Sequence, residues 1–439
     1  MTMPLKQSNP QAKPVAFNLW VGLLMLAGVS ACGATQTEKL IPPNMPVPLS
    51  YFGIHNHRFH DPTMRPTLDF GTWRLWDAGV AWSQLQPKKN EWRFARLDFA
   101  LNVASTSGLE VLMTFGRTPA WASARPVDRS FYGLGEAAPP RNMADFANFV
   151  RQVATRYAGR IKLYEVWNEP ASGGMFSGTV EQMVEMTKIV DEEVARVDPQ
   201  ARVVCPSPAK HESLAWFRRF VAAGGANHCD IIGYHFYTDS GQPEDKLRLV
   251  REVSTILEEN GLSSKPLWDT ESGHAIGVPQ YADSPAASAP GHVARWLILE
   301  WASGVERFYW YSWDHDRLGF KHPNGVMRDK ALAAYKRVQT WMLGSIFQSC
   351  EKSGVVWLCD LRLQDGRVAR VFWTSDNSES LVDIERGTWV EDISGYQGRP
   401  DTNRLKIKGD PVLIIGVAQQ EASALDANAV NGMQIRIHR

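Results

Sequence analysis

The chain has 439 residues, of which 44% are hydrophobic, so it is long enough to build one large barrel and a smaller second domain. Its 47 Lys and Arg residues equal its 47 Asp and Glu residues, which gives a net charge of zero. Because nucleic-acid binding needs a basic surface that neutralises phosphates, this balance argues against a nucleic-acid partner.

The N-terminal segment has the pattern of an export signal. Two lysines precede an apolar run, Phe17 to Val29, that is too short for an ordinary membrane-spanning helix. The run ends in Val29-Ser30-Ala31-Cys32-Gly33, and small residues before a Cys resemble the lipobox of bacterial lipoproteins. The resemblance implies that Cys32 becomes the acylated N-terminus and anchors the protein to a membrane. An ordinary signal peptide with an incidental Cys is the alternative.

These patterns give the first two expected segments. Residues 1–31 form the lipoprotein signal peptide, and residues 32–48, which are polar and rich in proline, form a tether. Gly33 after the Cys is similar to lipoproteins that are released to the outer membrane. We therefore expect an exported bacterial protein, located as a lipoprotein in the periplasm or at the outer membrane.

Residues 49–343 alternate short apolar runs with amphipathic helical stretches, as in a parallel βα fold. Eight strands is the number that closes a (β/α)8 TIM barrel, so we expect this α/β fold for the catalytic part of the chain. The predicted strands are Tyr51–His55, Thr72–Trp76, Glu110–Phe115, Leu163–Trp167, Arg202–Pro206, Asp230–Phe236, Pro266–Thr270 and Arg307–Tyr311.

Two of the intervening helices have clear start signals. Thr179 followed by Gln182 has the spacing of a capping box, and apolar residues then recur at helical intervals up to Val197. Asn142 is the expected N-cap of an earlier helix, whose apolar face includes Phe146 and Phe149. Both helices are predicted to cover a parallel sheet.

After Gly344 the pattern changes to strands at short spacing with no helix between them, which predicts a C-terminal all-β, sandwich-like domain over residues 344–418. The turn signal Asp365-Gly366 separates its first two predicted strands, Val355–Leu363 and Val368–Trp373. The further predicted strands are Leu381–Ile384, Trp389–Ile393, Leu405–Ile407 and Val412–Ile415. Residues 419–439 show no pattern and are expected to be a disordered tail.

Four cysteines follow the signal segment, at positions 205, 229, 350 and 359. An exported chain can oxidise its cysteines, but the sequence does not give the connectivity. Cys205 and Cys229 fall at neighbouring predicted strands and could form a disulfide, and buried free thiols are the equal alternative for each pair.

Acidic residues stand at the ends of two predicted barrel strands, where barrel enzymes place their active sites. The fourth strand ends in Asn168-Glu169-Pro170, and the seventh ends in Thr270-Glu271-Ser272. Retaining glycoside hydrolysis uses two opposed carboxylates, one as acid/base and one as nucleophile. Hydrogen-bond donors are predicted chiefly near Glu271, which favours Glu271 as the ionised nucleophile and Glu169 as the acid/base.

Here the sequence resembles a known group of enzymes. Asn168-Glu169-Pro170 after the strand resembles the acid/base motif of the large (β/α)8 clan of retaining glycosidases, and Thr270-Glu271 resembles its nucleophile strand. With its C-terminal β domain, the chain is most similar to glycoside hydrolase family 39. That family includes β-xylosidases, α-L-iduronidases and bacterial endoglycosidases of exopolysaccharide. The resemblance covers about residues 49–416, and it implies hydrolysis of O-glycosidic bonds in a polysaccharide or oligosaccharide.

The resemblance also implies roles for further residues. Asn168 would bond the substrate 2-hydroxyl, Tyr237 would bond the nucleophile, and Trp310 would form the aromatic floor of the glycone subsite. His235 would line the site, and Arg74 would either steady the nucleophile or form a buried ion pair of the barrel. The other expected sugar contacts are His55, His57, Trp121, Trp313 and Asp314. No metal and no cofactor is expected, and the protein is expected to act as a monomer on a carbohydrate.

Two rival functions have some support in the sequence. The His-x-His pattern of His55 and His57 suggests a metal-dependent hydrolase barrel, but the fourth and fifth strands lack the Lys and His ligands that such a site needs. A barrel that binds polysaccharide without cleaving it, within an export or scaffold assembly, is the second rival, because fold alone does not imply catalysis. The presence of both carboxylates argues against this second reading.

Overall fold

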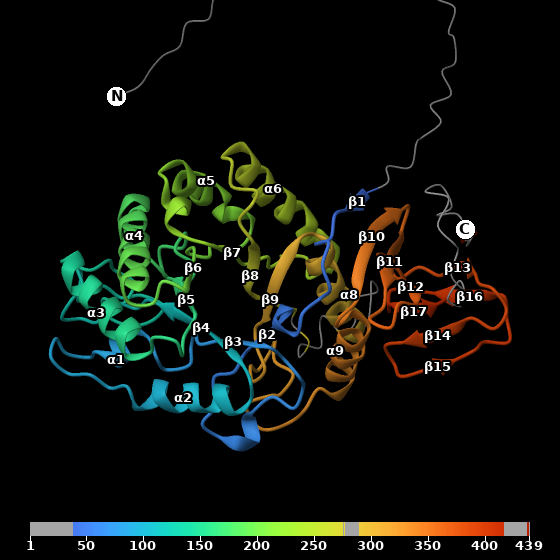
Figure 1. Ribbon diagram of the computed structural model, residues 1–439, viewed down its shortest axis with the longest axis horizontal. Helices are drawn as coiled ribbons and strands as arrows, with labels where there is room; N and C mark the ends of the chain where they lie inside the picture. The colour runs from blue at the N-terminus through green and yellow to red at the C-terminus, as the bar shows by residue number, and fades with distance from the viewer. Residues whose placement is uncertain (1–37, 275, 277–288, 417–436, 439) are drawn as a thin grey trace, which may run out of the picture. The chain divides into compact units, whose positions relative to one another are not determined.

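The computed structural model describes residues 38–274, 276, 289–416 and 437–438. Eight parallel strands form one sheet in the order β6-β5-β4-β3-β2-β9-β8-β7, with helices around it (Figure 1). The two ends of this sheet meet through a bridge between Val204 and Ile231, which closes the barrel. The (β/α)8 barrel predicted from the sequence is therefore confirmed. Its strands are β2 Phe52–His55, β3 Thr72–Arg74, β4 Glu110–Phe115, β5 Leu163–Val166, β6 Arg202–Val204, β7 Ile232–Tyr234, β8 Leu267–Ser272 and β9 Val305–Trp310.

Eight described helices accompany the barrel. They are α1 Trp82–Leu85, α2 Ala95–Thr106, α3 Met143–Arg156, α4 Val180–Val197, α5 Leu214–Ala222, α6 Lys246–Glu259, α8 Ala289–Ala302 and α9 Asp329–Met342. The two predicted caps are present. The side chain of Asn142 accepts the N–H of Ala144 at the start of α3, and Thr179 and Gln182 bond reciprocally at the start of α4. No described helix is both long and apolar enough to cross a membrane.

The chain continues into an antiparallel β domain. Its main sheet has the order β1-β10-β11-β12-β17-β14-β15, and a small sheet has the order β16-β13-β18. The strands are β1 Glu38–Leu40, β10 Ile346–Ser353, β11 Val356–Arg362, β12 Val368–Thr374, β13 Ser380–Asp383, β14 Trp389–Asp392, β15 Gln397–Gly398, β16 Arg404–Ile407, β17 Val412–Ile415 and β18 Ile437–His438. The all-β region predicted after the barrel is thus present.

The β domain and the barrel share a hydrophobic core. One buried cluster joins Trp296 and Trp341, on α8 and α9, to Trp357 and Trp373, on β11 and β12. Polar contacts follow the same interface, because the indoles of Trp373 and Trp341 donate to carboxylates across it. The last barrel helices are therefore covered by the β sheet on the side that faces away from the strands.

Two predicted segments differ from the structure. Residues 38–40, expected within a flexible tether, form β1 and pair with β10, because the edge of the β sheet offers unpaired backbone groups there. Ile437 and His438, expected within the tail, pair with β13. The signal segment, Cys32 and most of the tail lie outside the described residues.

Both cysteine pairs form disulfides. The bond between Cys205 and Cys229 links the end of β6 to the segment before β7, and the bond between Cys350 and Cys359 joins the facing strands β10 and β11. The first bond crosses the place where the barrel sheet closes.

Candidate active site

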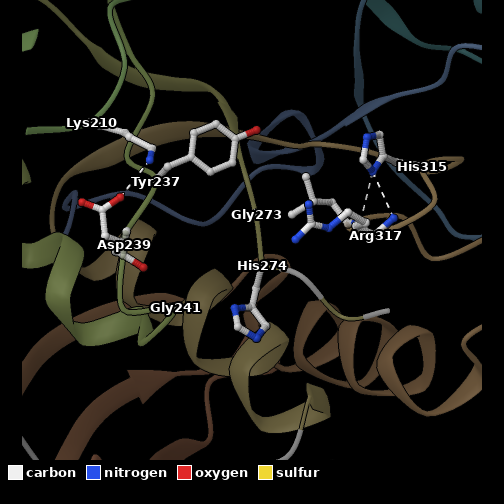
Figure 2. Close-up of a pocket in the computed structure, with 10 residues that line it drawn as sticks. Lys210, Tyr237, Asp239, Gly241, Gly273, His274, His315 and Arg317 are labelled. Carbon is white, nitrogen blue, oxygen red and sulfur yellow. Dashed lines mark hydrogen bonds and ion pairs between the residues drawn. The ribbon is translucent and has the colours of Figure 1, made fainter. Parts of the chain in front are cut away.

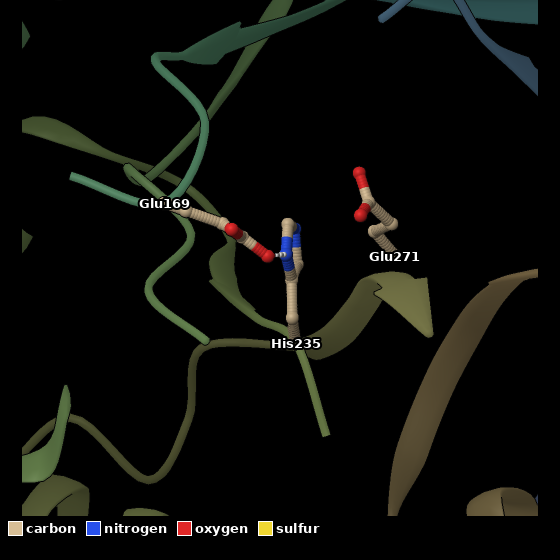
Figure 3. A group of neighbouring side chains, drawn as sticks. All are labelled: Glu169, His235 and Glu271. Carbon is tan, nitrogen blue, oxygen red and sulfur yellow. Dashed lines mark hydrogen bonds and ion pairs between the residues drawn. The ribbon is translucent and has the colours of Figure 1, made fainter. Parts of the chain in front are cut away.

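Two glutamates face each other at the carboxyl ends of barrel strands on opposite sides of the mouth. Glu169 follows β5, Glu271 is the last but one residue of β8, and His235, directly after β7, lies beside them (Figure 3). One carboxylate oxygen of each glutamate lies within 4.8 Å of the other. This separation is near the ~5–5.5 Å of retaining glycosidases and well short of the ~6.5–9.5 Å of inverting ones.

The loop that carries Glu169 has an unusual backbone. Both Trp167 and Glu169 have positive φ, 64° and 46°, in the left-handed region that side chains rarely adopt. The backbone N–H of Glu169 donates to the carbonyl of Ser207 at 2.9 Å, which helps to hold this conformation. Backbone strain of this kind is concentrated at functional sites, where the surrounding structure enforces it.

Arg74, on β3, connects the two strand ends from below. Its guanidinium is fully buried and donates to Glu165 at 2.7 Å, to Glu271 at 2.9 Å and to Asn168 at 2.8 Å. A forked donor of this kind holds all three acceptors in fixed positions. Arg74 thus contacts the candidate nucleophile and also forms a buried ion pair with Glu165, so both roles considered from the sequence are present together.

Glu271 is 7% exposed and has two donors, Arg74 on one oxygen and the hydroxyl of Tyr237 on the other, at 3.1 Å. Burial, followed by repulsion from Glu169, raises the pKa of Glu271 to about 8, although Arg74 opposes the rise. Two carboxylates this close share one proton over a wide pH range, because both cannot ionise cheaply in a buried site. The pair therefore has the single proton that an acid/base and a nucleophile need between them.

Glu169 has a different neighbour. Its Oε1 lies 3.0 Å from Nδ1 of the fully buried His235, whose Nε2 lies 3.1 Å from the hydroxyl of Thr270. Burial raises the pKa of Glu169, but when the His235 ring donates to it, that bond, the charge of the ring and then the positive charge of Arg74 lower the pKa below its ordinary value. The direction of the bond between His235 and Glu169 therefore decides which glutamate keeps the proton.

The histidines after β2 lie on the other side of the mouth. His55 is fully buried, and its Nε2 donates to the carbonyl of Thr270 at 3.0 Å, so it supports the nucleophile strand. The ring of His57 lies 5.2 Å from the ring of Tyr311. Asp314 is fully buried and accepts the backbone N–H groups of His57 and Arg58, so its role in the structure is to fix this loop.

Trp310 was expected to form the aromatic floor of the sugar site, and the structure places it elsewhere. It is fully buried, and its indole donates to the carbonyl of Leu318 at 3.0 Å. Side chains alternate along a strand, so the next residue faces the opposite way. Tyr311 is that residue, and its ring lies 5.0 Å from His55 while its hydroxyl donates to Asp77 at 3.0 Å. Tyr311, and not Trp310, is the aromatic side chain of this strand end that lies at the mouth.

Two other tryptophans also differ from expectation. Trp313 is fully buried in the core shared with the β domain, because the chain turns inward after Tyr311. Trp121 packs on Trp82, and its indole donates to the carbonyl of Gln86, so its contacts lie with the α1 segment and not with the glutamate pair. Neither presents a face to a sugar bound between the glutamates.

Several residues at the site were not predicted from the sequence. Asp77 follows β3 and accepts a hydrogen bond from Tyr311. Its charge also raises the pKa of Glu271, by less than burial and the charge of Glu169 do. Burial foremost raises the pKa of Tyr132, in the loop after β4; Asn168 opposes the rise, and the charges of Glu169 and Asp77 add to it. A polar residue directly after each predicted strand was the available signal for Asp77, whereas the long loop before Tyr132 gave none.

An open groove of about 260 Å³ adjoins the glutamate pair (Figure 2). Tyr237 and Gly273 connect it to the nucleophile, and Lys210, whose charge also acts on Glu169, stands on one wall. The opposite wall holds Arg317 and His315. The remaining lining residues are Thr238, Asp239, Gly241, His274 and Leu318. The groove gives a bound molecule room to extend beyond the two carboxylates.

Among the described residues, Glu169, His235 and Glu271 form the one group whose donor atoms are close enough to approach a metal ion together. Their donor atoms already have partners in Thr270, Arg74 and Tyr237, and the fixed positive charge of Arg74 at 2.9 Å from Glu271 opposes a cation there. His55 is directed to a backbone carbonyl, so the His-x-His pattern does not form a described metal group. The arrangement suits proton transfer and nucleophilic attack.

Comparisons with known proteins point to the same chemistry. Residues 77–192 match the model of glycosyl hydrolase family 10, and residues 141–338, which include both glutamates, match the glycosyl hydrolase catalytic core. No curated protein matches the chain in sequence.

Solved structures share the fold. A family 39 glycoside hydrolase from Bacteroides cellulosilyticus superposes with a TM-score of 0.68 at 18% identity, over 84% of this chain and 81% of that one. A monomeric β-xylosidase from Caulobacter crescentus gives 0.61 at 16% identity, over 86% of this chain and 97% of that one. A family 30 endoxylanase from Clostridium papyrosolvens gives 0.54 at 13% identity, over 86% and 99%. The chain is a (β/α)8 glycoside hydrolase whose fold is similar to that of family 39.

Proposed function

We propose that the protein is a retaining glycosidase in which Glu271 is the nucleophile and Glu169 is the acid/base. The observation that carries this proposal is the pair of opposed carboxylates with oxygens within 4.8 Å. At this distance one carboxylate can attack the anomeric carbon while the other reaches the glycosidic oxygen, and no room remains for a water between Glu271 and the sugar.

The reaction has two balanced steps. In the first, an oxygen of Glu271 bonds to the anomeric carbon, the glycosidic C–O bond breaks, and the proton of Glu169 passes to the leaving oxygen. In the second, water attacks the same carbon, its proton passes to Glu169, and the bond to Glu271 breaks. Tyr237 and Arg74 hold Glu271 in place through both steps. We assign the bond to the substrate 2-hydroxyl to Asn168, a role supported by its hydrogen bond from Arg74.

The substrate we propose is a polysaccharide or oligosaccharide, and bacterial exopolysaccharide is one candidate. The open groove beside the pair supports a substrate that continues past the cleaved bond. Because the acid/base protonates the leaving oxygen and Lys210 acts on Glu169, the groove wall at Lys210 belongs to the leaving-group side. The β-xylosidase and endoxylanase among the structural neighbours make xylan a second candidate.

Incubation with a panel of bacterial exopolysaccharides and plant glycans, including xylan, tests this function. We expect shorter saccharides from at least one polymer by chromatography, and NMR of the first product should show the anomeric configuration of the substrate. An inverted anomer would contradict the retaining mechanism. Binding without any product, with wild type and the Glu271→Gln variant indistinguishable, would favour the polysaccharide-binding barrel instead.

We also propose that the protein is exported and anchored to the periplasmic face of a membrane through acylated Cys32. The support is the short apolar run that ends in small residues before Cys32. In the native bacterium, Cys32→Ala should move the protein from the membrane fraction to the soluble periplasm. Unchanged membrane association of this variant would rule out the lipid anchor.

We propose that the protein acts as a monomer. A β-xylosidase of the same fold is monomeric, which supports this assignment. Light scattering behind a sizing column should give the mass of one chain, and a dimer mass would contradict the proposal.

A further inference from the structure

A chain of hydrogen bonds runs beneath the mouth of the barrel and ends on Glu169. The hydroxyl of Ser207 lies 2.7 Å from Glu165, the hydroxyl of Thr270 lies 2.9 Å from that of Ser207, and Nε2 of His235 lies 3.1 Å from Thr270. Nδ1 of the same ring lies 3.0 Å from Glu169. All of these side chains except that of Glu169 are fully buried, so no solvent interrupts the chain.

Glu165 determines which atom donates and which accepts in each of these hydrogen bonds. This carboxylate accepts from Arg74 at 2.7 Å and from Thr114 at 2.6 Å. Burial raises the pKa of Glu165, but the lowering effect, chiefly from the charge of Arg74, is larger, so the pKa lies below its ordinary value. Glu165 is therefore ionised at neutral pH. An ionised carboxylate only accepts hydrogen bonds, so the hydroxyl of Ser207 must donate to it.

Each hydroxyl group can donate only one hydrogen, so the donor in one hydrogen bond determines the donor in the next. Ser207 has used its hydrogen on Glu165, so the short contact of 2.9 Å with Thr270 requires that Thr270 donates. Thr270 has then used its hydrogen as well. At the contact of 3.1 Å, the oxygen of Thr270 must accept, and the hydrogen must come from Nε2 of His235.

A neutral imidazole has one N–H and one lone pair. Burial foremost, with the charge of Arg74, lowers the pKa of His235, so the ring is neutral at neutral pH. With its hydrogen on Nε2, the ring presents the lone pair of Nδ1 to Glu169. At 3.0 Å this lone pair needs a hydrogen from the carboxyl group of Glu169.

We infer that Ser207 and Thr270 are positioning residues that fix the tautomer of His235, and that this tautomer keeps the shared proton of the catalytic pair on Glu169. Neither residue touches the reacting atoms. They act through the ring, which accepts from the protonated acid and repels its ionised form. The catalytic role inferred for Ser207 and Thr270 rests on the proposed function. The tautomer of His235 does not, because it is a property of the protein without substrate.

The inference explains why two similar carboxyl groups, those of Glu169 and Glu271, take different roles as acid/base and nucleophile. Glu271 has two donors, Arg74 and Tyr237, and its ionised form uses both of them fully. Glu169 faces an acceptor, which opposes its ionisation and makes it a stronger base once it has lost its proton. After the first step, the ionised Glu169 facing the lone pair is therefore well suited to take a proton from the attacking water.

Several charged or titratable groups face the bond between Glu169 and His235 from the surrounding elements, and none of them is substituted in the variants below. They are Arg74 on β3, Glu165 on β5, Lys210 after β6, Tyr237 after β7, Glu271 on β8, His55 on β2 and Tyr132 in the loop after β4. The comparison between variants therefore isolates the effect of the hydroxyl chain.

The tautomer can be measured directly by nitrogen NMR of the full chain labelled with ¹⁵N-histidine, with the His235 signals assigned from a His235→Asn variant. Wild type at neutral pH should show a protonated Nε2 and an unprotonated Nδ1. Thr270→Val removes the acceptor of Nε2, so the hydrogen should move to Nδ1 and donate to Glu169. Thr270→Ser is the matched control, because it keeps the hydroxyl and should keep the wild-type tautomer.

The same variants should change the titration of Glu169, followed by carbon NMR of labelled glutamate and assigned from Glu169→Gln. We expect the pKa of Glu169 to fall by about one unit or more in Thr270→Val and to stay at the wild-type value in Thr270→Ser. Ser207→Ala should act like Thr270→Val, because it frees the hydroxyl of Thr270 to donate to Nε2. If Ser207→Ala does not fold, the two Thr270 variants decide the question.

A hydrogen on Nδ1 in the wild-type protein, or identical behaviour of Thr270→Val and Thr270→Ser, would overturn the inference. These measurements need no substrate. Failure to find a cleaved glycan would therefore count against the proposed function and leave the tautomer result intact, whereas the wrong tautomer in an active glycosidase would count against this inference alone.

Discussion

At the scale of single residues, substitution of each of the two glutamates should impair a different step of the reaction. Glu169→Ala removes the proton donor, so hydrolysis of substrates with poor leaving groups should fall by about 10²- to 10⁴-fold, while activated aryl glycosides should still form the glycosyl-enzyme. Azide should then raise the turnover of this variant, because the anion enters the space left by the side chain and attacks the intermediate. Steady-state rates with two leaving groups, with and without azide, provide the measurement.

Glu271→Ala is the matched control for that prediction. No other described carboxylate at the mouth is placed to attack in its stead, since Asp77 is engaged with Tyr311 and Glu165 lies below Arg74. This variant should be inactive with both kinds of leaving group and form no glycosyl-enzyme detectable by mass spectrometry. Equal impairment of the Glu169 variant with both leaving groups, together with no response to azide, would mean that the acid/base assignment is wrong.

The shared proton predicts the pH dependence. The pKa of Glu271 is raised to about 8, and because the two carboxyl groups are coupled, this value marks the loss of the last proton from the pair. Below about pH 8 one carboxyl group is protonated and can serve as the acid. Above it both are ionised, and kcat/KM should fall about tenfold for each pH unit. Rates measured from pH 6 to 10 test this, and a flat profile up to pH 10 would contradict it.

The sequence predicted much of the site, because barrels place catalytic groups where their strands end. Glu169, Glu271 and Arg74 lie at such positions, and the structure brings their side chains together. The aromatic residue was placed one position too early, since the end of β9 could not be located to a single residue and a shift of one reverses the side chain. Trp310 thus lies in the core and Tyr311 at the mouth. Hydroxyl chains such as that of Ser207 and Thr270 depend on three-dimensional contacts and leave no sequence pattern.

At the scale of elements, the closure between β6 and β7 is the least connected place in the barrel. The neighbouring barrel strands pair through ladders, whereas β6 and β7 are not paired as strands. Their segments meet through two isolated bridges, Val204 with Ile231 and Ala209 with His235. The disulfide of Cys205 with Cys229 crosses this place. It therefore supports the part of the barrel that carries Ser207 and His235.

Replacement of both Cys205 and Cys229 by Ser should lower the free energy of unfolding by about 2–4 kcal/mol, the usual effect of a bond that closes a loop of this size. Urea unfolding of the oxidised protein and of the double variant would measure the difference. The Cys350 and Cys359 pair is a suitable control, because it closes a shorter loop within a paired hairpin and should contribute less. Equal losses from the two double variants would contradict the argument from the barrel closure.

The elements themselves were predicted unevenly. All eight barrel strands and the capped starts of α3 and α4 agree with the sequence patterns, since long periodic segments and capping residues are strong local signals. The sequence pattern does not indicate β10, because its residues Ile346–Ser353 mix charged, polar and apolar side chains. It also missed β1, because three residues have too little pattern to show that they pair with a distant strand.

At the scale of the whole molecule, the β domain is part of the stable fold of the barrel. The buried cluster that contains Trp301 and Trp341 is completed by Trp357 and Trp373 from the β sheet. Removal of residues 345–439 would expose these helix faces to water, and large exposed apolar patches cause aggregation. We predict that the truncated barrel is insoluble, or melts at a much lower temperature than the full chain.

Expression of the truncated and full chains side by side, followed by thermal unfolding of any soluble material, would test this prediction. Trp373→Phe in the full chain is a milder companion, because it keeps the ring but removes the indole bond to Glu244. It should lower stability by about 1 kcal/mol and leave the glutamate pair untouched. A truncated barrel as soluble and as heat-resistant as the full chain would show that the β domain is dispensable.

The pairing of β1 with β10 would limit how far from a membrane the enzyme could act if Cys32 carries the proposed lipid anchor. An extended chain spans at most about 3.3–3.6 Å per residue, so a free segment from Cys32 to Pro48 would reach roughly 55 Å. Because Glu38 already belongs to the sheet, the free length from Cys32 shrinks to roughly 20 Å. An enzyme acylated at Cys32 would therefore reach only a thin layer next to the bilayer. Its substrates would be those glycan strands that pass through that surface or lie on it.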